Sequence, residues 1–376
     1  MRNKLLILND IGGKGGAEKI LSLYSEILAE SGFDVEVAFG SEGETYESVS
    51  KVVNKVSLID PPKILTIKYL KLFERVYRLL SLFLIILRFK GKTVVTNTLF
   101  MQIFASPIVR LLGKELIWYE HNIQPKGFRR SFIRFYAKLF PRYIIAVSNA
   151  VADVYRDLGL NDKVKVIHNG IPALPSASKE KLIELKREFK LKDSDFVVVA
   201  ISRITEYKGL HVLTKAIESI TDENVKVFIL GDTGISSKDL VYKRELVRTA
   251  SGNVTFLGWR DDASDWISLA NVFCAPAIGA DPFPTTILEA MSLGAICIVS
   301  EIGGQPESIK NGHSGYLFKP GSSEELATII NNIKDEFNYE STFEVKRSAL
   351  NSFKENFTIE KYTDRLNRVF QKIVEG

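Results

Sequence analysis

Two positively charged side chains in the second half of the chain have the spacing of an anion-binding loop. Arg203 and Lys208 lie five residues apart, between an apolar run and a helical pattern. On a loop at the carboxyl end of a strand, such a pair can converge on a diphosphate. The alternative interpretation is two solvated loop cations.

A second loop leads into a short helix further along the chain. We predict that Thr285 and Thr286 cap this helix and that its first N–H groups favour an anion. Glu289 lies one turn into the helix, where a carboxylate can accept hydrogen bonds from two ribose hydroxyls. Asp281 precedes Glu289 by eight residues. The alternative makes Asp281 a turn residue and Glu289 a surface charge.

A glycine-rich turn, Gly12 to Gly16, follows the first apolar run. It is not a dinucleotide fingerprint, because Glu18 occupies the third glycine position and no acidic residue ends the next strand. It also lacks the Gly-Lys-Ser/Thr of a phosphate-binding P-loop. The remaining interpretation is a helix N-terminus that suits a phosphate or a sugar, with a tight strand–helix turn as the alternative.

Composition excludes several protein classes. The 376 residues are 45% hydrophobic and 25% charged, which excludes disordered, collagen-like and disulfide-rich chains. Cys274 and Cys297 lie in apolar runs, which predicts buried strand thiols and a reducing compartment. With two cysteines, a structural zinc site needs histidines, and none of the four lies at ligand spacing.

Apolar stretches are too short to cross a membrane. The longest, Leu79–Leu87, has nine residues, whereas a span needs about 18. The N-terminal apolar run is also too short for a signal peptide. We therefore expect a cytoplasmic or peripheral protein.

Positive charge is concentrated in the first half. Residues 1–172 hold 25 basic and 16 acidic residues, a net charge of +9, whereas residues 173–376 hold 25 and 29, a net charge of −4. This asymmetry suits an anionic partner, such as membrane headgroups, a phosphorylated lipid or nucleic acid. We disfavour nucleic acid because no recognised binding motif accompanies the charge.

Two stretches of the basic half have amphipathic patterns. Residues 63–92 interleave Lys and Arg with Leu, Ile and Phe. In 127–142, Phe128, Phe132, Phe135, Tyr136 and Leu139 fall near helical spacing, and the basic residues on the other side are Arg129, Arg130, Arg134 and Lys138. Interfacial membrane helices have this composition. The alternative is that the apolar faces pack on the core and the charges are solvated.

Alternating strand and helix patterns position these residues. One series occupies the first half, and a second begins after the turn-rich stretch around 169–176. Strands alternating with helices predict parallel, doubly wound sheets, so we expect an α/β protein with two Rossmann-like domains facing across a cleft. Ligands then bind at the carboxyl ends of the strands.

Together these motifs resemble glycosyltransferase family 4, a group of retaining, nucleotide-sugar-dependent enzymes with the GT-B fold. The resemblance spans nearly the whole chain and rests on the order and spacing of several motifs. They are Gly15-Gly16-Ala17-Glu18, Glu120-His121-Asn122, Ala146-Val147-Ser148, Ile167-His168-Asn169-Gly170, Arg203…Lys208-Gly209, Leu230-Gly231-Asp232, Asp281…Glu289-Ala290-Met291…Gly294 and Gly303-Gly304-Gln305-Pro306-Glu307.

The resemblance implies domains and site residues. Residues 1–170 would bind the acceptor and 171–355 the nucleotide sugar, with a C-terminal helix, 356–376, packing back on the first domain. Arg203 and Lys208 would neutralise the departing diphosphate, and Glu289 would bind the ribose. The backbone donors to the diphosphate would be Thr285, Thr286 and Ile287, and the groups near the sugar would be Asp281, His121, Gly15 and Gly16.

Two departures from the family pattern bear on the sugar. The first acidic residue is usually Glu and here is Asp281, and Pro284 replaces the usual Gly after Phe283. Either change reshapes the sugar pocket, so the transferred sugar does not follow from the resemblance.

The function implied is retaining transfer of a sugar from a nucleotide-diphosphate sugar to a glycan or lipid-linked acceptor in cell-surface polysaccharide biosynthesis. Because the cations come from the protein, we expect no cofactor and no metal. The basic first domain suits a membrane-bound, anionic acceptor, so we expect a peripheral position on the inner face of the cell membrane. Two alternatives stay open: a nucleotide-sugar epimerase of the same fold, and a catalytically silent partner in polysaccharide assembly.

Overall fold

The two series of strands and helices form two separate parallel sheets. The computed structural model describes residues 3–13, 15–59, 71–124, 127–234, 236–337 and 339–375. The chain divides into unit 1, Met1–Asn169 with Tyr362–Gly376, and unit 2, Gly170–Lys361. The predicted α/β fold with two doubly wound parallel sheets is confirmed.

Unit 1 contains a seven-stranded sheet in the order β3-β2-β1-β4-β5-β6-β7. Every pair of neighbouring strands is parallel. The strands are β1 (Lys4–Asn9), β2 (Asp34–Phe39), β3 (Lys55–Leu58), β4 (Thr93–Thr96), β5 (Glu115–Glu120), β6 (Tyr143–Ala146) and β7 (Val164–Val166). The central strands are buried along most of their length, as parallel strands covered on both faces are.

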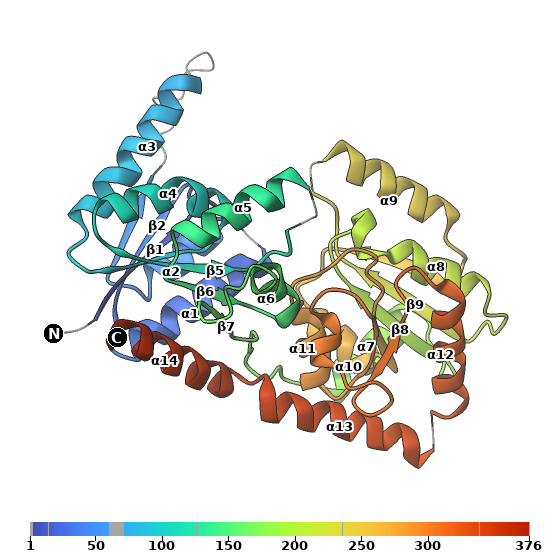
Figure 1. Cartoon of the computed structure of the whole chain (residues 1–376). Coiled ribbons are helices and arrows are strands. Elements are labelled where there is room, and N and C mark those ends of the chain that lie inside the picture. The colour runs from blue at the N-terminus through green and yellow to red at the C-terminus, as the bar shows by residue number, and fades with distance from the viewer. Residues whose placement is uncertain are drawn as a thin grey trace. The chain divides into compact units, whose positions relative to one another are not determined.

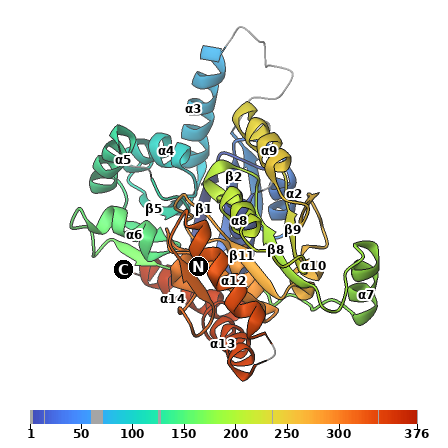
Figure 2. The ribbon, with the colours of Figure 1, turned by 90° about the vertical axis from the view of Figure 1, so that its right-hand side faces the viewer.

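Helices cover both faces of this sheet. They are α1 (Gly16–Glu30), α2 (Glu44–Ser50), α3 (Lys71–Arg88), α4 (Leu99–Leu111), α5 (Phe128–Leu139), α6 (Asn149–Arg156) and the last helix, α14 (Ile359–Glu375). Figure 1 shows α4 and α5 on one side of the sheet, with α1 and α14 on the other. In both views α4 lies between α3 and α5 (Figures 1 and 2).

Unit 2 contains a six-stranded parallel sheet in the order β10-β9-β8-β11-β12-β13. Its strands are β8 (Phe196–Ile201), β9 (Val225–Leu230), β10 (Val254–Gly258), β11 (Val272–Ala275), β12 (Ile296–Ser300) and β13 (Tyr316–Phe318). The chain order reverses between β8 and β11, and in such sheets the crevice at the reversal is the usual ligand site.

The helices of unit 2 pack on two hydrophobic cores. One core lies under α8, α9 and α12, and the other under α7 and α10. The helical segments are α7 (Lys179–Glu188), η2 (Glu206–Lys208), α8 (Leu210–Glu218), α9 (Ser237–Thr249), α10 (Ala263–Leu269), α11 (Thr285–Ser292), η3 (Gln305–Ser308), α12 (Ser323–Asp335) and α13 (Glu340–Asn356). Cys274 and Cys297 are buried, unpaired thiols on adjacent strands, as predicted, and burial raises the pKa of both.

Several elements differ from the sequence prediction. The amphipathic stretch 63–92 becomes α3 from Lys71, and its first residues, 63–70, lie outside the described residues. The sequence patterns did not predict the short strands β3 and β13 or the helices α2, α4, α6 and α13. The strands are short and half-exposed, so their apolar patterns are weak.

Candidate functional site

The loop after β8 holds the predicted cations in unit 2. Lys208 is the last residue of η2, which is one turn of 3₁₀ helix. Its Nζ donates to Oδ2 of Asp281 at 2.5 Å, and Asp281 lies in the loop after β11. The Arg203 guanidinium donates to the Tyr207 hydroxyl at 2.8 Å. The Lys208 ammonium also lies 5.5 Å from the centre of the Tyr207 ring. The structure therefore brings Arg203, Lys208 and Asp281 to one edge of the sheet.

Close backbone contacts fix this arrangement. Gly209 has a φ of +69°, and a Cβ there would lie 1.9 Å from the Pro276 carbonyl oxygen. Gly303 has a φ of +64°, and a Cβ there would lie 2.4 Å from the Asp281 carbonyl oxygen. These positions require glycine, because no side chain fits between the loops. The loops after β8, β11 and β12 therefore interlock around the Lys208–Asp281 pair.

The pair lines a small hollow at the carboxyl ends of β8 and β11. Its described lining also includes Ser202, Thr286 and Gln305. The side chains of Lys208 and Asp281 are 19% and 11% exposed. A cation held at the floor of a hollow, with hydroxyl groups around it, can bind an anionic group of a ligand.

Helix α11 begins beside this hollow, but not as predicted. Pro284 occupies the N-cap position, and no side chain caps the helix. Thr285 and Thr286 lie in its first turn, so the prediction that they cap it is wrong. The first N–H groups of a helix have no partner within the helix, so those of Thr285, Thr286 and Ile287 remain suited to an anion. Glu289 is half-buried one turn further along.

A buried polar network in unit 1 surrounds His121. His121 Nε2 lies 2.8 Å from Asn97 Oδ1, which also accepts from the Tyr24 hydroxyl at 3.1 Å. Asn97 Nδ2 donates to Asn9 Oδ1 at 2.9 Å, and Asn9 Nδ2 donates to the Ile11 carbonyl. The network thus joins His121 to the residue before the glycine turn.

These hydrogen bonds fix the tautomer of His121. The Asn97 amide nitrogen donates to Asn9, so the atom that faces His121 is the Asn97 amide oxygen, which accepts. His121 Nε2 must therefore be the donor and carry a proton. Burial lowers the pKa of His121 to about 3, so the ring is neutral and Nδ1 is an acceptor. The Tyr119 ring stacks on the imidazole at a centroid distance of 4.6 Å.

Glu120 is a buried carboxyl next to His121. Its Oε2 accepts from the Tyr155 hydroxyl at 2.6 Å and its Oε1 from the Asn122 N–H at 3.3 Å. Burial raises the pKa of Glu120 to about 7, and these hydrogen bonds limit the rise. The group therefore titrates near neutral pH.

In the glycine turn, Gly12 is closely packed, whereas Gly16 borders open space. Gly12 packs on the loop after β2, where a Cβ would lie 2.1 Å from the Ser41 carbonyl oxygen. Gly15 has extended backbone at the N-cap of α1, and a Cβ at Gly16 would have no neighbour within 4 Å. Lys14, between Gly12 and Gly16, lies outside the described residues.

Helix α5 turns its aromatic face away from the core. Ile133 and Ala137 are its buried residues. The opposite face holds four exposed apolar side chains, Phe128 (87%), Phe132 (36%), Phe135 (58%) and Leu139 (52%). The alternative in which these residues pack on the core is therefore wrong for α5.

The basic residues of α5 do not all lie together. Arg129 and Lys138 are exposed and flank the aromatic face, whereas Arg134 is half-buried. The Arg130 side chain is 19% exposed and lies 3.9 Å from Asp157. Two of the four predicted basic residues thus face inward.

The partners of His121 in this network, Asn9, Tyr24, Asn97, Tyr119 and Tyr362, were not among the predicted site residues. Asn9 ends β1 and Asn97 follows the adjacent strand β4, and this position at the carboxyl ends of strands is the sequence signal that could have indicated both residues. Tyr362 comes from α14 and bonds the Tyr119 hydroxyl at 2.7 Å. No local pattern predicts a contact across 243 residues.

Within the described ranges, no three His, Cys, Asp or Glu side chains gather as a metal site requires. Among the described helices, none is long and apolar enough to cross a membrane.

Two models of known protein families match the chain, and both describe the glycosyltransferases that its sequence motifs resemble. Residues 14–173 match the model for Glycosyltransferase Family 4, and residues 183–344 match that for Glycosyl transferases group 1. The chain belongs to the family 4 glycosyltransferases. The two matched ranges cover most of unit 1 and most of unit 2.

Individual relatives are distant. One is the UDP-Gal:alpha-D-GlcNAc-diphosphoundecaprenol alpha-1,3-galactosyltransferase of Escherichia coli, 26% identical over 56% of this chain and 55% of that enzyme. The chain thus spans about half the length of that relative. Another is an uncharacterised glycosyltransferase of Methanocaldococcus jannaschii, 24% identical over 83% of this chain and 81% of that protein.

A solved structure shows the same fold. Anabaena HepE in complex with UDP and glucose is 22% identical and has a TM-score of 0.84, covering 98% of this chain and 100% of HepE. This likeness confirms the GT-B fold.

Proposed function

We propose that the protein transfers a sugar from a nucleotide-diphosphate sugar to a glycan or lipid-linked acceptor. The observation that supports this most is the Lys208–Asp281 pair, held by interlocked loops where the strand order of unit 2 reverses. The N-terminus of α11 lies beside the same hollow. These groups suit a diphosphate, and the E. coli relative is named for a UDP-sugar donor.

In the proposed step, the bond between the anomeric carbon and the diphosphate oxygen breaks, and a bond to the acceptor oxygen forms. Arg203, Lys208 and the first N–H groups of α11 stabilise the charge that develops on the diphosphate. The acceptor hydroxyl gives its proton to the departing phosphate on the same face of the sugar, so the anomeric configuration is retained. Glu289 binds the ribose, and no metal takes part.

Groups at the carboxyl edge of the unit 1 sheet are proposed to contact the sugar. His121 is neutral, and its Nδ1 can accept a hydrogen bond from a sugar hydroxyl. The open space at Gly16 allows close approach of a ligand to the backbone of α1. We propose that Asp281 contacts the sugar from unit 2.

The exposed face of α5 supports a membrane-bound acceptor. Aromatic side chains flanked by Arg129 and Lys138 are typical of a helix that lies in the membrane interface. The acceptor of the E. coli relative is by its name a diphosphoundecaprenol-linked sugar. We therefore propose a lipid-linked acceptor, a role in cell-surface polysaccharide biosynthesis and a peripheral position on the inner face of the membrane.

The first experiment is a thermal-shift screen of the full chain against a panel of nucleotide-sugars. The stabilising donor is then assayed for release of its nucleotide diphosphate, with and without a membrane-lipid extract. Release that requires the extract supports transfer to a lipid acceptor. Turnover of the donor without an acceptor favours an epimerase, and stabilisation without turnover favours a silent binding partner.

A further inference from the structure

A row of basic residues lies at the amino edge of the unit 1 sheet. One basic residue directly precedes each of four adjacent strands: Lys92 precedes β4, Lys114 β5, Arg142 β6 and Lys163 β7. Neighbouring strands are about 4.8 Å apart, so the row spans roughly 14 Å. The row lies at the opposite end of β5 from His121, and Lys114 is about 23 Å from His121 at the usual rise per residue.

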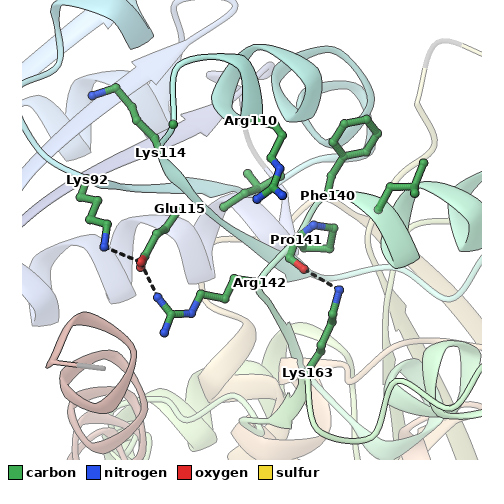
Figure 3. Close-up of a pocket in the computed structure, with 11 residues that line it drawn as sticks. Lys92, Arg110, Lys114, Glu115, Phe140, Pro141, Arg142 and Lys163 are labelled. Atoms are coloured by element: carbon green, nitrogen blue, oxygen red, sulfur yellow. Dashed lines mark hydrogen bonds and ion pairs between the residues drawn. The ribbon is translucent and has the colours of Figure 1, made fainter.

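The row borders a hollow of ≈ 520 Å³. Arg110, from the last turn of α4, adds a further cation, and Figure 3 shows its guanidinium pointing into the middle of the lining. Lys114 is turned away, because its Nζ donates to the Phe89 and Gly91 carbonyls. Four cations therefore face this region: Lys92, Arg110, Arg142 and Lys163.

A single carboxylate opposes these cations among the described lining residues. Glu115 pairs with both Lys92, at 2.8 Å, and Arg142. Lys163 Nζ donates to the Lys138 and Pro141 carbonyls, both at 3.2 Å. These carbonyls hold the ammonium in place but carry no net charge, so the hollow keeps a surplus of three positive charges.

The fold itself does not require this charge. Helix C-termini lie near the amino ends of strands and favour cations, which accounts for the carbonyl contacts of Lys114 and Lys163. Unit 2 has the same kind of sheet, yet none of the residues that precede its described strands is basic. They are Asp195, Asn224, Asn253, Asn271, Ala295 and Gly315.

An exposed apolar side chain lines the hollow. It is Leu139, which is 52% exposed. Leu139 also ends α5, so the hollow continues the exposed aromatic face of that helix. Positive charge beside this exposed leucine and the aromatic face of α5 fits a ligand that has an anionic group and acyl chains.

We propose that this hollow binds the phosphate of an anionic membrane phospholipid. Arg110, Arg142 and Lys163 would contact the phosphate, and Leu139 would meet the upper acyl chains. This site would fix the orientation of unit 1 on the membrane, in addition to the contact made by α5. The inference rests on the membrane contact proposed above but not on the sugar transfer.

The test measures binding of the full-length protein to phosphatidylcholine vesicles with and without phosphatidylglycerol. Arg110→Gln/Lys163→Gln should bind the phosphatidylglycerol vesicles roughly 25-fold more weakly, at about fivefold per lost charge. Lys215→Gln/Lys354→Gln, which neutralises two exposed lysines of unit 2, is the matched control and should bind as the parent does. Thermal stabilisation by the soluble nucleotide-sugar should be unchanged in both variants.

A second variant keeps the test independent of folding damage. Glu115→Gln removes the opposing carboxylate and should strengthen binding to phosphatidylglycerol vesicles, which loss of structure would not do. Parent-like vesicle binding by Arg110→Gln/Lys163→Gln overturns the proposal, even if an α5 variant loses binding. The hollow also does not bind a lipid if it binds inorganic phosphate but Arg110→Gln/Lys163→Gln binds vesicles as the parent does. If the parent and all the variants fail to transfer sugar but the vesicle results are as expected, the proposed function is contradicted and the lipid site is not.

Discussion

At the scale of single residues, Gly16 is a position where a side chain would not disturb the fold but could block the proposed ligand. A Cβ at Gly16 has no protein neighbour within 4 Å, and alanine is the better helix former. We expect Gly16→Ala to keep or raise Tm while it raises KM for the nucleotide-sugar by about 10-fold, the cost of crowding a packed ligand.

The matched control for this change is Gly252→Ala, which also adds a methyl group in open space, but in unit 2. It should change neither Tm nor KM. Parent-like KM in Gly16→Ala would show that the turn does not contact the donor.

Lys208 is the residue on which the proposed chemistry depends most. Lys208→Met keeps the length of the side chain but removes the charge that stabilises the departing diphosphate. Loss of such a group lowers kcat by about 10²–10³-fold, measured as nucleotide diphosphate release. The control is Lys215→Met, on the exposed face of α8. Activity of Lys208→Met within about threefold of the parent would contradict the assignment.

Glu120 makes the stability of unit 1 depend on pH. Because its folded pKa is raised from 4.5 to about 7, its stabilising contribution is complete below pH 4.5 and is lost as the pH rises towards 7. Glu120→Gln has no such loss, so its free energy of unfolding relative to the parent should rise by about 1 kcal/mol per pH unit from about pH 5 to pH 7.

This trend must be measured as a difference between variant and parent. The lowered pKa of His121 acts in the opposite sense below its ordinary value of 6.5, so the parent curve alone hides the effect of Glu120. Glu355→Gln, the same replacement at an exposed site of α13, is the control. A difference that stays constant with pH would mean that Glu120 is not held protonated.

At the scale of elements, α5 has two exposed basic residues, Arg129 and Lys138, and two half-buried ones, Arg130 and Arg134. Arg129→Glu/Lys138→Glu should weaken binding to anionic vesicles by at least about 10-fold, because both residues flank the exposed aromatic face. Lys361→Glu/Lys372→Glu, on exposed positions of α14, carries the same charge change and should have a smaller effect.

Vesicle co-sedimentation at two salt concentrations measures this effect, since the electrostatic part weakens with salt. If the two double variants bind equally, net charge and not α5 determines the attraction. Reversal of Arg130 is a poor test, because that side chain pairs with Asp157 inside unit 1.

At the scale of the whole molecule, the last residues stabilise the first unit. Phe370 on α14 is fully buried and packs edge-on against Phe33 at 6.4 Å. Phe370→Ala should cost about 3–5 kcal/mol of the free energy of unfolding. Hydrogen exchange should then accelerate in β1, β2 and β5 and stay unchanged in β8, β9 and β11.

The neighbouring exposed residue supplies the control, Gln371→Ala, which should leave exchange at the parent level. Equal acceleration in both sheets would show that the two units unfold together.

The sequence by itself determined the class of fold, the family and the residues of local loops. Apolar runs alternating with helical patterns predict parallel sheets wherever they occur, and Arg203, Lys208 and Asp281 lie in short segments with clear strand and helix boundaries. Buried thiols at Cys274 and Cys297 followed from their apolar neighbours for the same reason. Each of these features has a signal in a short stretch of sequence, although the contacts that complete it are made between distant segments.

Only the tertiary structure decided which distant residues meet and which face of a helix is covered. The network from Asn9 through Asn97 to His121, and the Tyr119–Tyr362 hydrogen bond, join residues far apart in sequence. The pattern of α5 predicts an apolar face but not its direction, because that depends on what the sheet below it leaves uncovered. The basic row at the amino edge was equally hidden, since Lys92, Arg142 and Lys163 become neighbours only when their strands pair.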